Sequence, residues 1–372
     1  MLLPPTLVFE SDDANFVECE ASAPLVDKNG VPTGAPCMDI HYTEAGRPLV
    51  TAAYLASLDG WRQDPLIASA LYKQYPFMEE ESRDGTAQQS LVAQADTKPQ
   101  AAPVADPTGG PTGDTTGDLA GDPKAEPAAE RSPRFYLYGD AKSSLDVAHD
   151  LARQGKLEPW DAVMVTSQSE GRGQLRRDWS SPCGNLYAAW RLPLEFPMTE
   201  GYAALVVGSM LAEALSTIRI PIELKWPNDI ILKGKKVGGI LLEERGGVLL
   251  AGIGINVFSA PHESALREDH AMAATCLRDE GFHFATPLTL FCSLVNMGRF
   301  WYGKQVHDEN GARFPQCMEK YLAWRHQNIV VHGGNSDIKN GTIVGIAPCG
   351  GLKVIHNGVE KILDSGSIVL EY

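Results

Sequence analysis

The chain has 372 residues, which is enough for two or three domains of roughly 150 residues each. Its formal net charge of −15 argues against a protein whose main task is to bind nucleic acid or an anionic membrane. The excess charge lies in one part of the chain. Residues 1–133 hold 21 acids against 8 bases, whereas residues 134–372 hold 26 against 24.

The seven cysteines are scattered and include no Cys-x-x-Cys pair, a pattern that favours a reducing compartment. The apolar start, MLLPPTLVFE, has no basic segment and reaches Glu10 early, which is untypical of a signal peptide. The longest apolar stretch, residues 202–220, contains Glu213 and Arg219, so we expect no membrane span. These features predict a cytoplasmic protein.

The first 133 residues divide into two parts by composition. Residues 1–81 contain one helix candidate, which begins at Asp64 and Pro65, and otherwise form an N-terminal region of unknown fold. Residues 78–134 contain no aromatic residue and are rich in Ala, Pro, Gly, Thr and acids. Such a segment cannot offset the roughly 1–2 kcal/mol per residue that ordering the backbone costs. We therefore predict a disordered acidic linker over residues 82–133.

Residues 134–325 alternate between helical and strand patterns. The predicted helices span residues 144–155 and 199–219, the latter opened by Thr199 and Glu200, and most of residues 287–324. The predicted strands span residues 162–166, 185–192, 222–225, 237–243 and 248–256. The pattern indicates a domain that combines a sheet with packed helices.

The last 47 residues change to short strands separated by glycine-containing turns. The predicted strands are residues 329–331, 342–346, 352–355, 360–363 and 367–370. Asn357-Gly358 lies between two of them and is a strong signal for a tight hairpin. We expect a small barrel over residues 326–372.

Two stretches carry residues suited to binding an anion. After the strand ending near Thr166, residues 168–179 contain Gly171-Arg172-Gly173 and two more arginines. Glycines admit a ligand close to the backbone, and guanidinium groups pair with carboxylates or phosphates, but a solvated basic loop would look the same. Lys225 ends an apolar strand before Trp-Pro-Asn-Asp, where it either presents a fixed charge to a ligand or has a structural role.

Glycines inside two predicted strands point to a close backbone approach. They are Gly238 and Gly239 in one strand and Gly252 and Gly254 in the next, and tight packing against a helix is the alternative. Glu243 and Glu244 follow the first pair and suit either a Mg²⁺ site or a solvated rim. The residues alone leave these alternatives open.

The order of these motifs resembles the biotin protein ligase family over residues 134–372. The series runs from Ser143-Ser144 through Gln168-x-x-Gly-Arg-Gly to Lys225-Trp-Pro-Asn-Asp, and then to the glycine-bearing strands and the terminal barrel. The resemblance implies an α+β fold, with a mixed sheet and helices mainly on one face as in class II aminoacyl-tRNA synthetases. It also implies a C-terminal SH3-like barrel. The implied reaction joins biotin and MgATP into biotinyl-5′-adenylate, then transfers biotin to a lysine of a biotin carboxyl carrier protein.

The resemblance also assigns residues. Those implied to be catalytic are Lys225 and Arg172. Those implied to contact biotin are Ser143, Ser144, Gln168, Gly171, Arg172, Gly173, Lys225, Gly239 and Gly254. Those implied to bind the nucleotide are Arg172, Gln174, Arg176, Arg177, Trp179, Asn228 and Asn256. The resemblance implies that Mg²⁺ binds together with ATP, but it does not indicate which residues coordinate the ion.

The chain departs from the family pattern at three positions. Lys142 replaces an acid, Gln174 replaces an arginine and Arg176 replaces a glycine, which puts the serine turn and the retention of adenylate in doubt. The acidic N-terminal region has no helix-turn-helix pattern, so we expect no winged-helix domain and no nucleic-acid partner. A monomer and a homodimer both remain open. The alternative functions are a lipoate or octanoate ligase or transferase, and a non-catalytic biotin or adenylate sensor.

Overall fold

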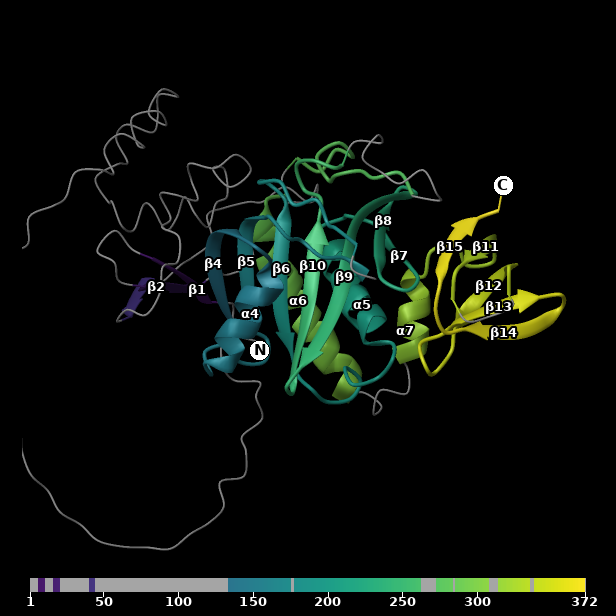
Figure 1. Ribbon diagram of the computed structural model, residues 1–372, viewed down its shortest axis with the longest axis horizontal. Coiled ribbons are helices and arrows are strands. Elements are labelled where there is room, and N and C mark those ends of the chain that lie inside the picture. The colour runs from purple at the N-terminus through teal and green to yellow at the C-terminus, as the bar shows by residue number, and fades with distance from the viewer. Residues whose placement is uncertain are drawn as a thin grey trace, which may run out of the picture.

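The computed structural model describes residues 133–174, 177–261, 272–283, 285–307, 314–334 and 338–371, together with three N-terminal strands (Figure 1). The helix predicted to begin at Asp64 and the linker predicted over residues 82–133 lie outside the described residues, apart from residue 133. The described helices include none that is long and apolar enough to cross a membrane.

Ten strands form one mixed sheet. Their bounds are β1 Thr6–Glu10, β2 Phe16–Glu20, β3 Ile40–Thr43, β4 Arg134–Ala141, β5 Ala162–Gln168, β6 Leu186–Leu192, β7 Ile222–Lys225, β8 Asp229–Leu232, β9 Lys235–Arg245 and β10 Val248–Ile255. The order across the sheet is β3-β2-β1-β4-β5-β6-β10-β9-β8-β7. The β1–β4 and β4–β5 pairs are parallel and the others are antiparallel, so the predicted mixed sheet is confirmed.

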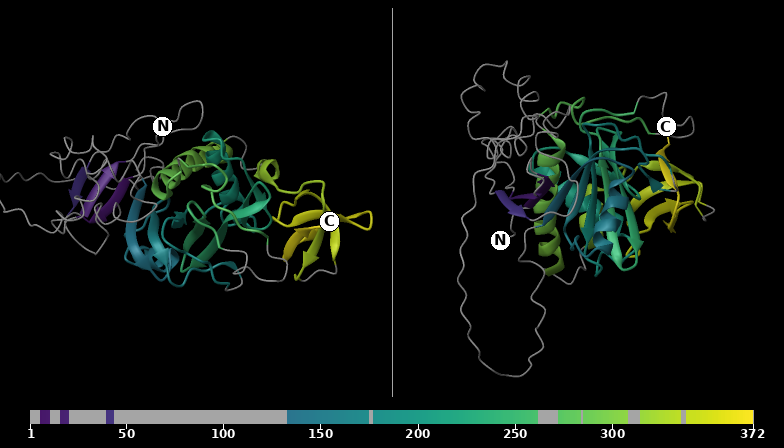
Figure 2. Two further views of the ribbon diagram at one scale, coloured as in Figure 1. Left: turned by 90° about the horizontal axis from the view of Figure 1, so that it is seen from above. Right: turned by 60° about the vertical axis from the view of Figure 1, so that its left-hand side comes forward.

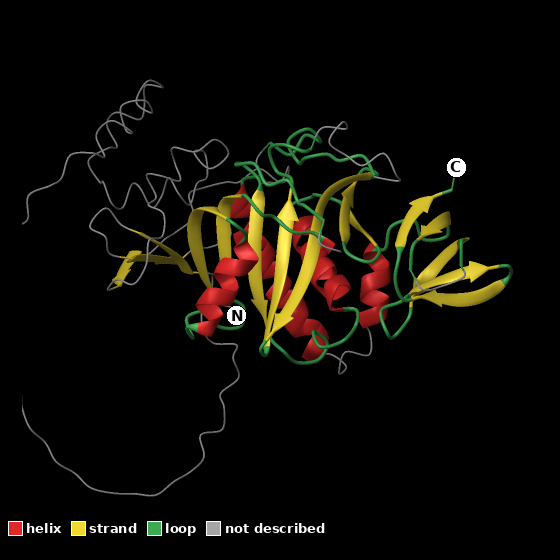
Figure 3. Cartoon of the chain, viewed as in Figure 1, coloured by secondary structure: helices red, strands yellow, loops and turns green. Residues whose placement is uncertain are grey.

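Helices cover both faces of this sheet unequally (Figure 3). They are α4 Ser144–Arg153, α5 Ala203–Thr217, α6 Pro287–His307 and α7 Phe314–Tyr321. Of the described helices, α4 alone packs on one face, through a small cluster that includes Leu145, Tyr187 and Leu250. The other face packs against the remaining helices through the main hydrophobic core. Adjacent residues of β9 point to opposite faces of the sheet. Ile240 belongs to the main core, and Leu241 packs against the α4 cluster.

The N-terminal strands extend the same sheet. Thr6, Leu7 and Val8 of β1 lie opposite Arg134, Phe135 and Tyr136 of β4, and β2 and β3 follow in antiparallel order. Part of the region to which the sequence assigned no fold thus continues the sheet of the following domain. The boundary after residue 81 stays a prediction.

Helix α4 begins where the sequence predicted. Ser143 has an extended backbone and its Oγ accepts a hydrogen bond from Leu145 N at 3.3 Å, which is an N-cap. Lys142, in the place of a family acid, forms a surface ion pair with Glu170 at 3.0 Å and leaves this cap intact. The doubt about the serine turn is therefore resolved.

The predicted start of the second helix is wrong. Helix α5 begins at Ala203, because residues 195–202 form successive turns closed by Met198 N to Glu195 O and Glu200 N to Pro197 O. A Cβ on Gly201 would come within 2.9 Å of Cys349 O, so this segment packs directly on the C-terminal part of the chain. Tertiary contact outweighs the local cap signal. Strands β4 and β8 were not predicted.

The C-terminal residues form a separate five-stranded antiparallel sheet (Figure 2). Its strands are β11 Asn328–His332, β12 Asn340–Ile346, β13 Leu352–His356, β14 Val359–Leu363 and β15 Ser367–Leu370, ordered β14-β13-β12-β11-β15. Asn357 and Gly358 both have positive φ angles, of 52° and 77°, as a two-residue hairpin turn requires. The sheet contacts the larger domain where Trp226 Nε1 donates to Gly350 O at 3.0 Å.

Candidate active site

A row of directly opposed residues crosses the ten-stranded sheet on its α4 face. From β6 to β7 the row consists of Tyr187, Gly254, Gly239, Asp229 and Lys225. Opposed residues of antiparallel strands project to the same side, so the row has a large side chain at one end and a charged pair at the other. Between them, two glycines expose the backbone of β9 and β10.

The indole of Trp179 covers these two glycines. A Cβ on Gly254 would come within 2.8 Å of the indole, and one on Gly239 would lie 3.4 Å away, so any larger residue at position 254 would displace the ring. We call Gly239 and Gly254 the glycine floor. Trp179 Nε1 is buried and has no hydrogen-bond partner among the described residues. An unpaired donor above an open backbone surface is a feature expected of a ligand site.

Three charged residues meet at the β7 end of the floor, and we call them the Asp229 cluster. Lys225 Nζ lies 2.9 Å from one carboxylate oxygen of Asp229, and Lys236 Nζ lies 2.6 Å from the other. Lys236 Nζ also lies 5.2 Å from the centre of the Trp179 ring. The side chain of Lys225 is 9% exposed and that of Lys236 is 31% exposed. Two cations share one anion, so the cluster has a net positive charge.

The Asp229 carboxylate stays ionised in this setting. Burial alone would raise the pKa of Asp229, but Lys236 and Lys225 outweigh that effect and the pKa lies below its usual value. The aspartate therefore fixes both ammonium groups beside the glycine floor while neutralising only one of them.

A polar group at the start of α4 lies on the same face. Ser144 donates to Gln168 Oε1 from its backbone N at 2.9 Å and from its Oγ at 3.1 Å. Gln168 Nε2 in turn donates to Ser181 Oγ at 2.8 Å. Ser143 and Ser144 are buried, so this group presents ordered hydrogen-bonding atoms in a largely dry setting.

Residues 171–174 and 177–179 pair as the two arms of a small hairpin between these two groups. Trp179 N donates to Gly171 O at 2.9 Å, and Gly173 N donates to Arg177 O at 2.7 Å. Gly171 cannot be replaced without a clash, because a Cβ there would lie 2.5 Å from Trp179 O. One strand of the hairpin therefore carries Arg172, and the other carries Trp179.

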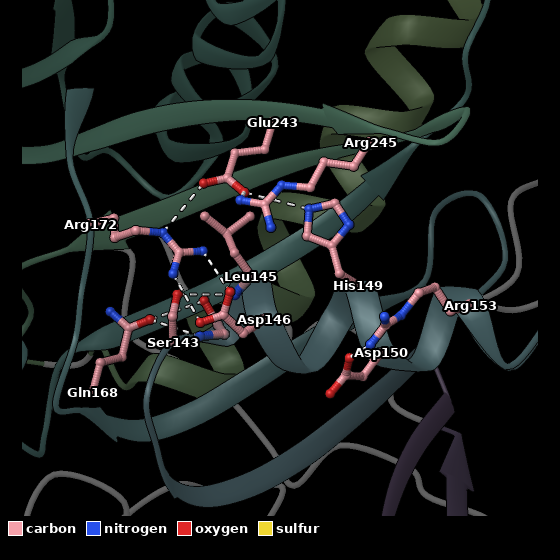
Figure 4. A network of polar contacts seen from close by, with 11 residues as sticks. Ser143, Leu145, Asp146, His149, Asp150, Arg153, Gln168, Arg172, Glu243 and Arg245 are labelled. Carbon is pink, nitrogen blue, oxygen red and sulfur yellow. Dashed lines mark hydrogen bonds and ion pairs between the residues drawn. The ribbon is translucent and has the colours of Figure 1, made fainter. Parts of the chain in front are cut away.

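The side chain of Arg172 lies in a second charged group, which we call the Arg172 cluster (Figure 4). Its Nη1 and Nη2 each lie 2.9 Å from a carboxylate oxygen of Asp146 on α4, and its Nε lies 3.4 Å from Glu243 Oε1 on β9. Arg245 lies 2.7 Å from the other oxygen of Glu243. The cluster consists of Arg172, Asp146, Glu243 and Arg245, and its two positive charges match its two negative charges.

The pKa directions agree with this pairing. The hydrogen bonds to Arg172 hold the pKa of Asp146 below its usual value, and the same bonds raise the pKa of Arg172. His149 lies on the same helix, 3.5 Å from Glu243 Oε2, and burial lowers its pKa. The Asp146–Arg172 pair is thus ionised at neutral pH.

The structure brings some predicted site residues together and separates others. Gly239, Gly254, Trp179 and Lys225 share one surface, while Ser143, Ser144 and Gln168 form the polar group beside α4. Arg172 lies with acids and not with Lys225. Gln174 and Arg177 are exposed on the hairpin, and Arg176 lies outside the described residues.

The two predicted asparagines have structural hydrogen bonds. Asn228 Nδ2 donates to Ile240 O at 2.7 Å, and the buried Asn256 donates from Nδ2 to Thr275 O at 3.1 Å. Both hold loops next to β9. Their side chains therefore position the edge of the glycine floor in the structure.

Sequence reasoning missed Lys236, Asp229 and Asp146. The signal for Lys236 was present, since it lies two residues before the glycine pair of β9 and would flank any ligand there. Asp146 has no local signal, because its partner Arg172 is 26 residues away. Among the described residues, no group of three or more His, Cys, Asp or Glu side chains could hold a metal ion.

Comparison with known proteins identifies the domain. Residues 139–258 match the model of the biotin/lipoate A/B protein ligase family. The bifunctional ligase/repressor BirA of Escherichia coli is 38% identical over 116 residues, covering 29% of this chain and 36% of BirA. The biotin–[acetyl-CoA-carboxylase] ligase of Paracoccus denitrificans is 33% identical over 134 residues, covering 34% of this chain and 55% of that ligase. The chain thus spans about a third to just over half of these relatives.

A solved structure supports the same grouping. The biotin protein ligase from Aquifex aeolicus, determined in complex with biotin and ATP, superposes with a TM-score of 0.54 at 26% identity. The match covers 64% of this chain and 98% of the Aquifex chain. The chain therefore carries, at residues 139–258, a domain of the biotin/lipoate A/B protein ligase family, to which the Paracoccus biotin–[acetyl-CoA-carboxylase] ligase and the Aquifex biotin protein ligase are similar.

Proposed function

We propose that this protein is an ATP-dependent biotin–protein ligase. It forms biotinyl-5′-adenylate from biotin and MgATP, then transfers biotin to a lysine of a biotin carboxyl carrier protein. The observation that carries the proposal is the glycine floor under Trp179 with the positively charged Asp229 cluster at its end. The family domain and its biotin ligase relatives support the same reaction.

The proposed pose of biotin follows from the polarity of the surface. The ureido ring needs hydrogen-bonding partners at fixed positions, and the group of Ser143, Ser144 and Gln168 offers them beside α4. The apolar part of biotin lies on the glycine floor, so the indole of Trp179, which packs on Gly254 and Gly239 in this structure, must lift to admit biotin and then cover it. Its carboxylate then points toward the Asp229 cluster.

Lys236 is the better candidate than Lys225 for direct contact with the reacting groups. Attack of the biotin carboxylate on the α-phosphate brings two anions together, and a fixed ammonium group stabilises the charge in the transition state. Lys236 is the more exposed of the two lysines and lies beside Trp179. Lys225 is nearly buried and lies against Asp229, so we assign it the role of holding the cluster together.

The nucleotide would bind next to this point. Gln174 and Arg177 on the hairpin, with Asn228 and Asn256 at the floor's edge, are proposed nucleotide-binding residues. Arg176, which lies outside the described residues, is proposed with them. A magnesium ion that enters as MgATP is held mainly by phosphates and water, so it does not need a dedicated cluster of carboxylates. Closing the hairpin over the adenylate would exclude water from the mixed anhydride.

The rest of the chain fits this assignment. We propose residues 134–325 as the catalytic domain and the C-terminal sheet as a small SH3-like barrel, which its five short strands and the bulge between Ile343 and Gly345 support. The scattered cysteines favour the cytoplasm. The acidic N-terminal region favours a ligase without nucleic-acid binding.

A two-step assay tests the proposal. The full-length protein is incubated with biotin, labelled ATP and a biotin carboxyl carrier domain, and biotinyl-adenylate and biotinyl-lysine are measured separately. Lipoate and octanoate replace biotin in parallel reactions. Adenylate formed only with lipoate or octanoate would move the protein to the alternative ligase class, and binding without adenylate would identify a sensor.

One substitution tests the site. Gly254→Ala places a methyl group 2.8 Å from the indole of Trp179 and should weaken biotin binding by roughly tenfold or more, as measured by calorimetry. Gly303→Ala on α6 is the matched control, because nothing lies within 4 Å of the added methyl group. Equal biotin affinities for the two variants would exclude the glycine floor as the biotin site.

A further inference from the structure

The guanidinium group of Arg172 is already paired with carboxylates and is not free to bind a ligand anion. Each nitrogen of its guanidinium group has a carboxylate neighbour, two of them at 2.9 Å on Asp146 and one at 3.4 Å on Glu243. The bidentate pairing with Asp146 is the strong geometry for an arginine–carboxylate bond. A ligand phosphate would have to displace these carboxylates before it could use Arg172.

The partners of Arg172 belong to two different elements. Asp146 lies in the first turn of α4, and Glu243 lies near the end of β9, on the strand that also contributes Gly239 to the floor. Arg172 itself belongs to the first strand of the hairpin. The ion pairs therefore join the hairpin to the helix and to the sheet at once (Figure 4).

The hairpin transmits this attachment to Trp179. Arg172 lies opposite Asp178 as a bridge pair, and the adjacent Trp179 is hydrogen-bonded to Gly171 at 2.9 Å. Trp179 covers the glycine floor from the other strand. Whatever fixes Arg172 in place therefore also fixes the cover of the proposed ligand surface.

We propose that Asp146 and Glu243 are positioning residues that act through Arg172. They hold the hairpin down on the sheet, keep Trp179 over the glycine floor, and so slow the release of bound adenylate. Neither acid touches the ligand. This inference rests on the proposed function for its effect on adenylate, while its effect on the hairpin does not depend on that function.

Direct contact between Arg172 and the adenylate phosphate predicts the opposite result. In that arrangement Asp146 competes with the ligand for the guanidinium group, and removing its charge would strengthen adenylate binding. In the positioning arrangement, removing the charge loosens the hairpin and weakens retention. The sign of the effect separates the two.

The test compares Asp146→Asn with Asp150→Asn in the full-length protein. Asp150 lies one helical turn further along α4 and pairs with Arg153 at the surface, so its variant is the matched control. Hydrogen exchange of the peptide that contains residues 171–179 is measured without ligand, and adenylate release is measured by chasing labelled biotinyl-adenylate with unlabelled compound.

We expect Asp146→Asn to increase both the hairpin exchange rate and the adenylate release rate by roughly tenfold, the equivalent of one charge-assisted bond. Asp146→Glu, which keeps the carboxylate, should restore slow release, and Glu243→Gln should show a smaller increase. Arg172→Met should raise both rates as much as Asp146→Asn does. The double variant Asp146→Asn/Arg172→Met should release adenylate no faster than Arg172→Met alone.

Unchanged hairpin exchange in Asp146→Asn would overturn the proposal, and so would slower adenylate release. If the natural protein forms no biotinyl-adenylate, the proposed function fails, and the exchange measurement on the ligand-free protein still decides whether the acids hold the hairpin. Additive effects of Asp146→Asn and Arg172→Met on the release rate would also contradict the proposal. Two residues that act through one ion pair lose the same interaction, so the second substitution should add nothing.

Discussion

The Asp229 cluster and the Arg172 cluster are both built from basic and acidic side chains, yet they differ in charge balance. Lys225 and Lys236 share one carboxylate, which leaves one positive charge beside the glycine floor. Arg172 and Arg245 face two carboxylates, which leaves none. The first cluster can attract an anion and the second cannot without breaking bonds. A basic residue in a glycine-rich motif is therefore not by itself evidence of an anion site.

The comparison also separates two kinds of contribution to the proposed reaction. The lysines of the Asp229 cluster stabilise charge, because their surplus positive charge lies where the carboxylate and phosphate would meet. Arg172 and its two acids hold the hairpin in place. Three substitutions test this division.

The largest effect is expected at Lys236. Lys236→Met keeps an apolar chain against Trp179 but removes the surplus charge, and we expect adenylate formation to fall about a hundredfold. Pyrophosphate release at saturating ATP and biotin measures this. Lys235→Met is the control, since Lys235 is 51% exposed and pairs with Glu280 at the surface. Equal rates for the two variants would remove Lys236 from the reaction.

Asp229→Asn should remove a pH-dependent part of the stability. The folded-state pKa of Asp229 is lowered, so its pairing stabilises the fold fully above the ordinary carboxyl pKa and is lost as the pH falls through the folded value. We expect a loss of about 3 kcal/mol at neutral pH, because two lysines lose their partner. Urea titrations between pH 2.5 and 7 should show the gap to the natural protein closing below about pH 4. A constant gap would mean that the carboxylate charge is unimportant.

The smallest effect is expected at Gln174. This exposed residue lies on the hairpin where the family has an arginine, and Gln174→Arg adds a positive charge there. We expect adenylate release to slow by about threefold, the scale of an exposed ion pair. Stopped-flow release of a fluorescent adenylate analogue would measure it. Identical release from both proteins would show that the hairpin's own charge does not contribute to retention.

Several elements could be predicted from local sequence because local contacts produce them. Ser143 caps α4 as its position indicated, and Asn357-Gly358 forms a tight hairpin because both residues tolerate a positive φ angle. The start of α5 could not be predicted, since the packing of Gly201 against Cys349 overrides the signal at Thr199. Strand β8 was not predicted because its four residues, which follow a proline turn, are too few to show a strand-like alternation of apolar and polar residues.

The candidate site divides in the same way. The sequence by itself determined which glycines and basic residues are available, and their order along the chain identified the family domain. Only the tertiary structure decided that Arg172 pairs with Asp146 and Glu243, which lie 26 and 71 residues away from it, and that Lys236 joins Lys225 on Asp229. The reason is physical. The charge available to a ligand depends on which groups already neutralise one another, and that is set by strand register and helix packing across the fold.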